Sequence, residues 1–273
     1  MKKFESFGRV VRQPVFPTEL HSAAANVVHE YFSRIPLVDT VLVVNSCARG
    51  QAVADSDLDF AILAKLGTTA SQIESLQGNW DRFSLQDQIV KEYKGSSKFA
   101  HLHLDVISGE YTPTVLEVGV ASDYFEIEIG NQVCYSAPMG EVGEHFQILQ
   151  ERWLPFYDEE LRLRRFSMMK DGCQYDLDHI PRFVARKLSF QAFDILCKAF
   201  QEYLQVLFIG AGVYPIAYNK WIRYQIESLL GEAELYSRLP PIISVSDIES
   251  NEINKKSELL QELLDQVILK KKA

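Results

Sequence analysis

The chain has 273 residues, 47% of them hydrophobic, and a formal net charge of −9. That length allows one large or two ordinary domains with a proper core, and we expect two. The acidic balance argues against nucleic acid as a partner, because backbone phosphates are bound by basic surfaces. No apolar run approaches the ~20 residues of a membrane span, so we expect no membrane partner.

The four cysteines are scattered along the chain and show no paired spacing of the kind that binds metals. They are Cys47, Cys134, Cys173 and Cys197. No secretory leader is recognisable at the start of the sequence. We therefore expect reduced thiols in a cytoplasmic protein.

The first predicted element is a helix after an irregular lead-in over residues 1–17. Apolar residues recur at helical spacing from Leu20 to Ile35, with Thr18 placed to cap the start and Pro36 to stop the end. Two strands are predicted next, at about 39–45 and 57–64. The helix is expected to lie against the sheet that these strands begin.

The two strands flank the stretch that carries the chemistry. A β-branched apolar run ends at Asn45-Ser46, and the next apolar run opens with Asp57 and Asp59, separated by one leucine. Side chains alternate in a strand, so both carboxylates point to one side. Like charges that close repel. The usual remedy is a hard divalent cation such as Mg²⁺.

A third carboxylate stands on a later predicted strand, residues 100–108. Leucines and a valine alternate there with His101, His103 and Asp105. If this strand lies beside the Asp57/Asp59 strand, Asp105 joins the pair. We interpret the two histidines as ordinary hydrogen-bonded residues. Three carboxylates, Ser46 in a turn and Arg49 after it describe a site for moving a phosphoryl-linked group with the help of a metal.

These motifs resemble the DNA polymerase β-type nucleotidyltransferase superfamily. Its signature is an apolar strand, a Gly-Ser or Gly-Gly turn, a gap of about ten residues, Asp-x-Asp, and a third Asp on a later strand. Here the parts read Asn45-Ser46, Ser56-Asp57-Leu58-Asp59-Phe60 and Leu104-Asp105-Val106, within residues 38–108. Asn45 stands where the family has glycine. Asparagine tolerates the left-handed backbone better than most residues, so the turn can survive.

Beyond the third carboxylate the elements are less distinctive. Residues 69–93 are predicted to be helical with a break at Gly78-Asn79, before a loop at 94–98. Segments 124–129 and 133–135 flank Gly130-Asn131 and predict a hairpin. Its first strand would carry Tyr124, Glu126 and Glu128 on one face. That face is either a solvated sheet surface or the wall of a pocket for a cationic acceptor.

From Gly140 the apolar period changes from two to 3.6, which predicts a domain boundary. We expect a catalytic domain at residues 1–140 and a helical domain at 141–273. Helices are predicted at 157–170, 181–209 and 218–230, and a last one follows a capping box of Ser246 and Glu249. The fold class is therefore α+β: a mixed β-sheet flanked by helices, of the nucleotidyltransferase type that the resemblance implies, and a C-terminal helical bundle.

The resemblance also implies an activity like that of the aminoglycoside and lincosamide antibiotic nucleotidyltransferases. Such an enzyme transfers a nucleoside monophosphate, AMP if the donor is ATP, to a hydroxyl and releases pyrophosphate. Two Mg²⁺ ions would be held by Asp57, Asp59 and Asp105. The nucleotide phosphates would be bound by Ser46, Arg49 and Lys220, the last from the helical half. The acidic charge favours a small cationic acceptor, with Glu126 and Glu128 as its candidate ligands. The sequence leaves open whether the protein forms a homodimer.

Four other interpretations compete. Asp55, Asp57 and Asp59 match the first half of a calcium loop, but Phe60 and Leu66 stand where that loop needs glycine and glutamate. The acidic stretch could also be a solvated turn without a ligand. A regulatory module that binds nucleotide without turnover is suggested by Asn45. An enzyme that acts on protein or RNA is the fourth, and the low basic charge counts against RNA.

Overall fold

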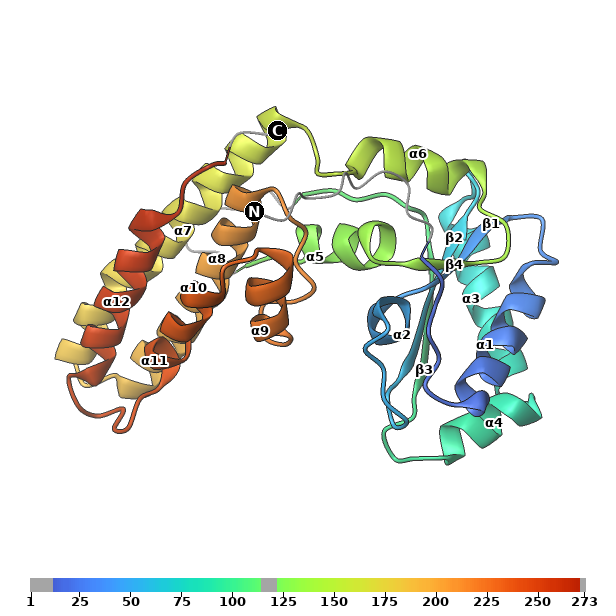
Figure 1. Cartoon of the computed structure of the whole chain (residues 1–273), viewed down its shortest axis with the longest axis horizontal. Helices are drawn as coiled ribbons and strands as arrows, with labels where there is room; N and C mark the ends of the chain where they lie inside the picture. Colours follow the sequence, from blue (N-terminus) through green and yellow to red (C-terminus); the bar gives the residue numbers. More distant parts are fainter. Residues whose placement is uncertain (1–11, 114–121, 271–273) are drawn as a thin grey trace. The chain divides into compact units, whose positions relative to one another are not determined.

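The computed structural model describes residues 12–113 and 122–270 (Figure 1). Contacts within the chain divide it into two compact units. The sheet unit comprises residues 12–112 and 128–154, and the helical unit comprises residues 113, 122–127 and 155–270. The described chain therefore has a mixed α+β fold. The change of apolar period predicts a domain boundary between residues 140 and 141. In the structure the sheet unit continues to residue 154, because helix α6 (Glu144–Trp153) packs on strands of the sheet.

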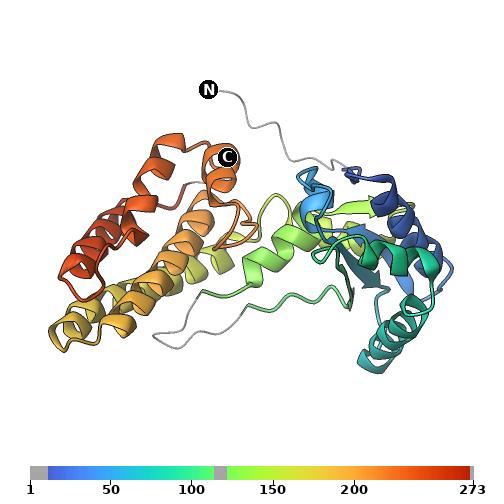
Figure 2. The ribbon, with the colours of Figure 1, turned by 90° about the horizontal axis from the view of Figure 1, so that it is seen from below.

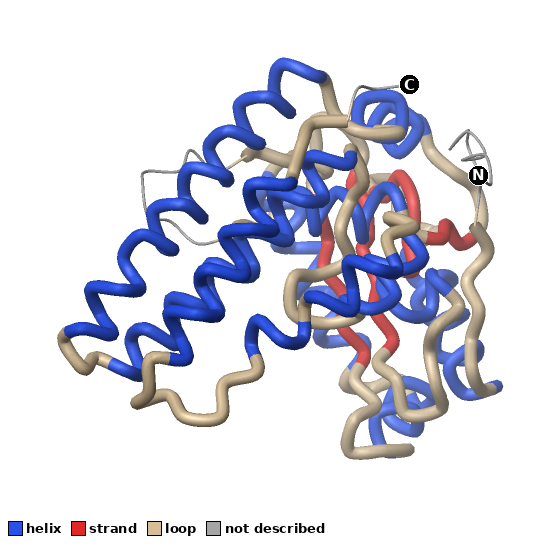
Figure 3. The backbone as a smooth tube through the Cα atoms, turned by 60° about the vertical axis from the view of Figure 1, so that its left-hand side comes forward, coloured by secondary structure: helices blue, strands red, loops and turns tan. Residues whose placement is uncertain are grey.

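The sheet unit is built on four strands in the order β3-β2-β1-β4. Figure 3 draws the strands in red among the helices of the chain. They are β1 (Val38–Val43), β2 (Leu58–Ala64), β3 (Leu102–Ile107) and β4 (Ala137–Met139). β1 runs antiparallel to both β2 and β4, whereas β2 and β3 are parallel. The sheet is therefore mixed, as predicted, and β1, β2 and β3 lie close to their predicted positions.

Three helices pack around the core on one side of this sheet: α1 (Glu19–Phe32), α3 (Ala70–Ser84) and α4 (Gln88–Gly95). The Thr18 side chain accepts a hydrogen bond from the backbone N–H of His21, so the predicted cap of α1 is confirmed. The predicted break at Gly78-Asn79 is wrong. Leu76 and Trp80 are both buried in the core and keep α3 continuous. The break comes at residues 85–87, where Asp87 caps α4.

The predicted hairpin at 124–135 is also wrong. Helix α5 (Phe125–Ile129) continues into a π-helical turn over Gly130–Cys134. The buried residues Phe125, Ile129 and Val133 recur every fourth position, which is the spacing of one helix face. Tyr124 is exposed and Glu126 is buried, so the expected acidic stripe on one face of a strand does not exist.

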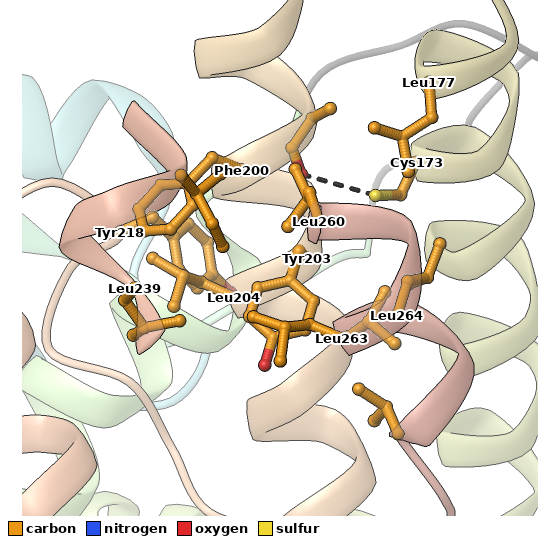
Figure 4. Close-up of a cluster of buried hydrophobic side chains, with 14 of the residues drawn as sticks. Cys173, Leu177, Phe200, Tyr203, Leu204, Tyr218, Leu239, Leu260, Leu263 and Leu264 are labelled. Carbon is orange, nitrogen blue, oxygen red and sulfur yellow. Dashed lines mark hydrogen bonds between the residues drawn. The ribbon is translucent and has the colours of Figure 1, made fainter. Parts of the chain in front are cut away.

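The helical unit is organised by three long helices that contact one another: α7 (Glu159–Ala185), α8 (Ser189–Ala211) and α12 (Glu252–Gln266). Helix α7 does not stop near 170 as predicted, because Met169, Cys173, Leu177 and Ile180 extend one buried stripe. Figure 4 shows part of the shared core, including Phe200, Leu204 and Leu260.

Shorter helices complete this unit: α9 (Ile222–Tyr224), a π-helical turn over Gln225–Leu229, α10 (Ala233–Arg238) and α11 (Pro240–Ile243) (Figure 2). The predicted capping box is wrong. Ser246 donates both its N–H and its Oγ–H to Glu252, at 2.9 and 2.7 Å, and not to Glu249. Among the described residues, no helix combines the length and the apolarity that crossing a bilayer requires.

Candidate functional site

The turn after β1 opens with a residue in the left-handed backbone conformation. Asn45 has φ 58°, in the left-handed region, and opens the short helix α2 (Asn45–Arg49). The expectation that Asn45 tolerates a left-handed backbone in this turn is therefore confirmed. Cys47 and Ala48 are buried in the core of the sheet unit, and Ser46 is half-buried beside them. The backbone N–H of Val44 donates to the carbonyl of Asp59 at 3.0 Å, which ties this turn to β2.

The two aspartates lie at the start of β2. Leu58 and Phe60 are buried in the core, so strand alternation puts Asp59 on the opposite face of the sheet, where it is half-buried. Asp57 directly precedes the strand. Its Oδ1 accepts a hydrogen bond from the backbone N–H of His101 at 3.0 Å, and its Oδ2 lies 3.9 Å from Nε2 of His103. The side chain of Asp57 is thereby oriented by the neighbouring strand.

Asp105 lies on that neighbouring strand. In the parallel pairing, Asp59 is opposite His103 and Ala61 is opposite Asp105. Leu104 and Val106 enter the core, so His103 and Asp105 are exposed on the same face as Asp59. The register therefore brings Asp105 to the same face of the sheet as Asp59. Asp105 lies two residues after His103, the residue opposite Asp59.

The carboxylates do not form a complete set of metal ligands. Among the described residues, no group of three or more His, Cys, Asp and Glu side chains is placed to hold a metal ion. The donor chemistry of Asp57 and Asp59 nevertheless fits Mg²⁺. This ion is usually bound by one or two carboxylates, with water and substrate phosphates filling the other positions.

Two buried side chains beneath the site, Cys47 and Tyr93, have raised pKa values, chiefly because they are buried. Burial and then the charge of Asp59 raise the pKa of Cys47 to about 11. Burial also raises the pKa of Tyr93, and the nearby acidic groups of Cys47, Asp57 and Asp59 add to the rise. Both side chains therefore stay neutral at physiological pH.

The residue before Asp57 is anchored by two helices. The carbonyl of Ser56 accepts a hydrogen bond from the Tyr93 hydroxyl at 2.9 Å and lies 3.1 Å from Nε2 of His21. Sequence reasoning missed both partners, which are 37 and 35 residues from Ser56 along the chain. The recognisable signal was weak: each is one polar side chain on an otherwise apolar helix face.

Arg49 is held by two neighbouring side chains. Its Nε donates to Oε1 of Gln51 at 3.1 Å, and its Nη1 donates to Oδ1 of Asn131 at 3.0 Å. These bonds fix the half-buried guanidinium in the sheet unit. The sequence predicts a hairpin turn at Asn131, and the contact between Asn131 and Arg49 spans 82 residues, so no local pattern indicates it.

Of the remaining candidate residues, Glu128 is exposed in the sheet unit, where its charge adds to burial in raising the pKa of Tyr111. Lys220 belongs to the helical unit and is exposed. Trp221 has φ 61°, so the helix begins at Ile222 and not at Tyr218 as predicted, and Lys220 lies before it. The role of Lys220 as a phosphate ligand stays a prediction.

Glu126 lies in the helical unit and is fully buried. It forms an ion pair with Arg165, with Nε and Nη2 at 2.5 and 2.8 Å from its two oxygens. The Tyr157 hydroxyl and Nε2 of Gln205 each donate to it at 2.8 Å. The expectation that Glu126 shares an open face with Glu128 is therefore wrong, because its carboxylate is enclosed by four donated hydrogen bonds.

Comparisons with known proteins add little. No family model matches the sequence, and no curated protein matches it. A solved structure of spectinomycin adenyltransferase AAD(9) from Enterococcus faecialis, with ATP and spectinomycin, is 12% identical and aligns over 91% of this chain and 100% of its own. The TM-score is 0.25. At that value the likeness does not establish a shared fold.

Proposed function

We propose that the protein is a metal-dependent nucleotidyltransferase that transfers a nucleoside monophosphate from a nucleoside triphosphate to a hydroxyl group. The placement of the carboxylates and of the turn at Asn45 supports the proposal. The parallel register of β2 and β3 brings Asp105 to the same sheet face as Asp59, and the left-handed turn at Asn45 is tied to Asp59 through Val44. A phosphate-binding turn next to carboxylates on adjacent strands is what phosphoryl-group chemistry with a metal needs.

Asp57 and Asp59 would hold Mg²⁺, with Asp105 as a ligand of a second ion. When bound with the nucleotide, Mg²⁺ neutralises phosphate charge and lowers the pKa of a coordinated hydroxyl. The hydrogen bond from His101 and the anchoring of Ser56 keep the Asp57 carboxylate on the open face before any ligand binds. This preorganisation is the contribution of the protein.

The remaining residues would bind the nucleotide phosphates and accept the proton of the acceptor hydroxyl. The Ser46 hydroxyl would donate to a phosphate oxygen, and the Arg49 guanidinium would stabilise charge on the leaving pyrophosphate. The acceptor oxygen bonds to the α-phosphorus as the bridging bond to the β-phosphate breaks. The acceptor proton passes to the carboxylate of Asp105, which is exposed and so can be reached.

ATP is the first donor to test, and a small cationic molecule of the aminoglycoside kind is the first acceptor. The net charge of −9 favours a cationic partner over nucleic acid. Of the two glutamates proposed for acceptor binding, only Glu128 is exposed. Acceptor recognition is therefore proposed for Glu128.

The test is a screen of labelled ATP and other triphosphates against small-molecule and protein acceptors. We expect Asp57→Asn and Asp59→Asn each to abolish transfer without lowering the unfolding temperature, because each change relieves repulsion between carboxylates. Asp55→Asn is the matched control, since Asp55 is exposed in the preceding turn and should retain activity. A stability loss in Asp57→Asn or Asp59→Asn with activity intact would contradict the assignment.

A second candidate is a module that binds nucleotide without turnover. It is favoured by the lack of a preformed group of three metal ligands in the described residues and by asparagine at position 45. Such a module would be stabilised thermally by ATP and would release no pyrophosphate with any acceptor. Pyrophosphate release in the screen would eliminate it.

A further inference from the structure

The π-helical turn after α5 carries Asn131, a residue to which the proposed transfer gives no role. The turn covers Gly130–Cys134, and the backbone N–H of Tyr135 donates to the carbonyl of Gly130 at 2.8 Å. That bond spans five residues, one more than in an α-helix. Such π-helical turns are rare and occur frequently at functional sites. The side chains of this turn therefore invite comparison with the site in the same unit.

Two neighbouring side chains of the turn bind different partners. Oδ1 of Asn131 accepts a hydrogen bond from Nη1 of Arg49 at 3.0 Å. Oε1 of Gln132 accepts one from the Tyr111 hydroxyl at 2.8 Å, and the ring of Tyr111 packs edge-on against Trp153. The turn is thus joined to Arg49 by one residue and to a buried aromatic pair by the next. Of these two contacts, only the first reaches a residue proposed to bind phosphate.

The guanidinium of Arg49 is bonded from two directions. Arg49 is the last residue of α2, and Gly50 follows with φ 68°, a left-handed conformation that glycine adopts without strain. The chain turns back there, so that Oε1 of Gln51 accepts from Nε of Arg49 at 3.1 Å. Asn131 holds Nη1 of the same planar group. Bonds to two of its nitrogens fix the orientation of a guanidinium.

Both of these acceptors are side-chain amides. An amide oxygen orients a guanidinium without neutralising its positive charge, whereas a carboxylate in the same place would form an ion pair. The contacts of Asn131 and Gln51 therefore orient Arg49 at no cost to its charge. A positive group held in a fixed direction in advance is what stabilises negative charge on a phosphate most effectively.

We propose that Asn131 is a positioning residue for phosphate binding. It holds the Arg49 guanidinium toward the β- and γ-phosphates of the nucleotide, the part that leaves as pyrophosphate. The inference rests on the proposed nucleotidyl transfer, in which Arg49 stabilises the leaving pyrophosphate. Asn131 touches no phosphate itself and acts only through Arg49. Gln51 acts in the same way on Nε of Arg49.

The probe is inorganic pyrophosphate with Mg²⁺, measured by titration calorimetry on the full chain. A neutral hydrogen bond contributes about two- to tenfold to an equilibrium constant, so Asn131→Ala should weaken pyrophosphate binding within that range. Arg49→Met should weaken it more, because a charged hydrogen bond to phosphate is lost. Gln132→Ala is the matched control. It removes an amide acceptor from the same turn, but the partner of Gln132 is Tyr111, so pyrophosphate affinity should stay unchanged.

Asn131→Asp separates positioning by a neutral group from a purely structural contact. Aspartate keeps the acceptor oxygen and the size of the side chain, so a structural role predicts pyrophosphate binding as in the wild type. Our inference predicts weaker binding, because the new carboxylate neutralises Arg49. Urea unfolding shows whether each variant is folded. If Asn131→Ala does not fold, Gln51→Ala replaces it and should show the same loss.

The outcomes separate this inference from the proposed function. Suppose that the wild type binds pyrophosphate and that Asp59→Asn abolishes this binding. Equal affinities of Asn131→Ala and Gln132→Ala would then refute the inference and leave the transferase proposal standing, and so would wild-type affinity in Asn131→Asp. If the wild type binds neither pyrophosphate nor ATP in the presence of Mg²⁺, the transferase proposal fails and the inference fails with it.

Discussion

Replacing Glu126 by alanine is expected to destabilise the protein by about 3–5 kcal/mol, the range for removing one partner of a buried ion pair. The carboxylate is fully buried and accepts hydrogen bonds from three side chains, with Arg165 closest at 2.5 Å. Without it, the Arg165 guanidinium stays buried with Asp123 as its remaining acidic partner. A buried charge that has lost its main partner is the physical origin of the cost.

Two further variants separate charge from burial. Glu126→Gln keeps the size of the side chain but loses its charge, so about 1.5–3 kcal/mol is expected, the range for a hydrogen bond to a charged group. Glu227→Ala is the matched control. It removes an i,i+4 pair with Arg223 at 3.7 Å, in which the arginine side chain is 69% exposed. Exposed helix pairs contribute about 0.3–0.5 kcal/mol, so little change is expected.

The assay is urea unfolding at neutral pH followed by far-UV circular dichroism, with tryptophan fluorescence as a second probe. Coincident curves from the two probes would license a two-state analysis. The reasoning is refuted if Glu126→Ala and Glu227→Ala lose the same free energy of unfolding. In that case the burial of Glu126 would make no additional contribution to the free energy of unfolding.

Three other changes test separate parts of the structure. Asn45→Val should destabilise by about 1–2 kcal/mol because a β-branched residue resists φ 58°, whereas Asn45→Gly should not; thermal unfolding of both decides this. Asp39 accepts hydrogen bonds from the backbone N–H groups of His145 and Phe146 and so caps α6. Asp39→Ala should therefore lower the free energy of unfolding, measured in urea, by about 1–2 kcal/mol, and a loss below about 0.3 kcal/mol would contradict this. Burial and then Asp176 raise the pKa of Glu202 to about 9. The folded state therefore retains a proton that the unfolded state releases, and stability should fall as pH rises from about 5 to about 9. Glu202→Gln should flatten that fall, and identical urea midpoints against pH in wild type and variant would refute it.

The strands and the carboxylates could be predicted because their signals are local. Leu58, Phe60 and Ile62 alternate with polar or small residues, and the same alternation around Asp105 places it on one face of β3. Thr18 caps α1 through a contact only three residues away. Where sequence pattern and tertiary packing agree over a few residues, the prediction holds.

The segment around Glu126 could not be predicted because its determinant is distant. Residues 124–128 alternate as a strand would, and the helical spacing of Phe125, Ile129 and Val133 competes with that pattern. The choice is made by Arg165, 39 residues further along the chain, which pairs with Glu126 in the interior. No residue pattern near Glu126 in the sequence indicates that Arg165 is its partner.

The central claim is tested most directly by titrating ATP into the protein with and without Mg²⁺. The account predicts binding that needs Mg²⁺, is lost in Asp59→Asn, and is retained in Asp55→Asn at unchanged urea midpoints. ATP binding that persists in EDTA with equal affinity in all three proteins would contradict it.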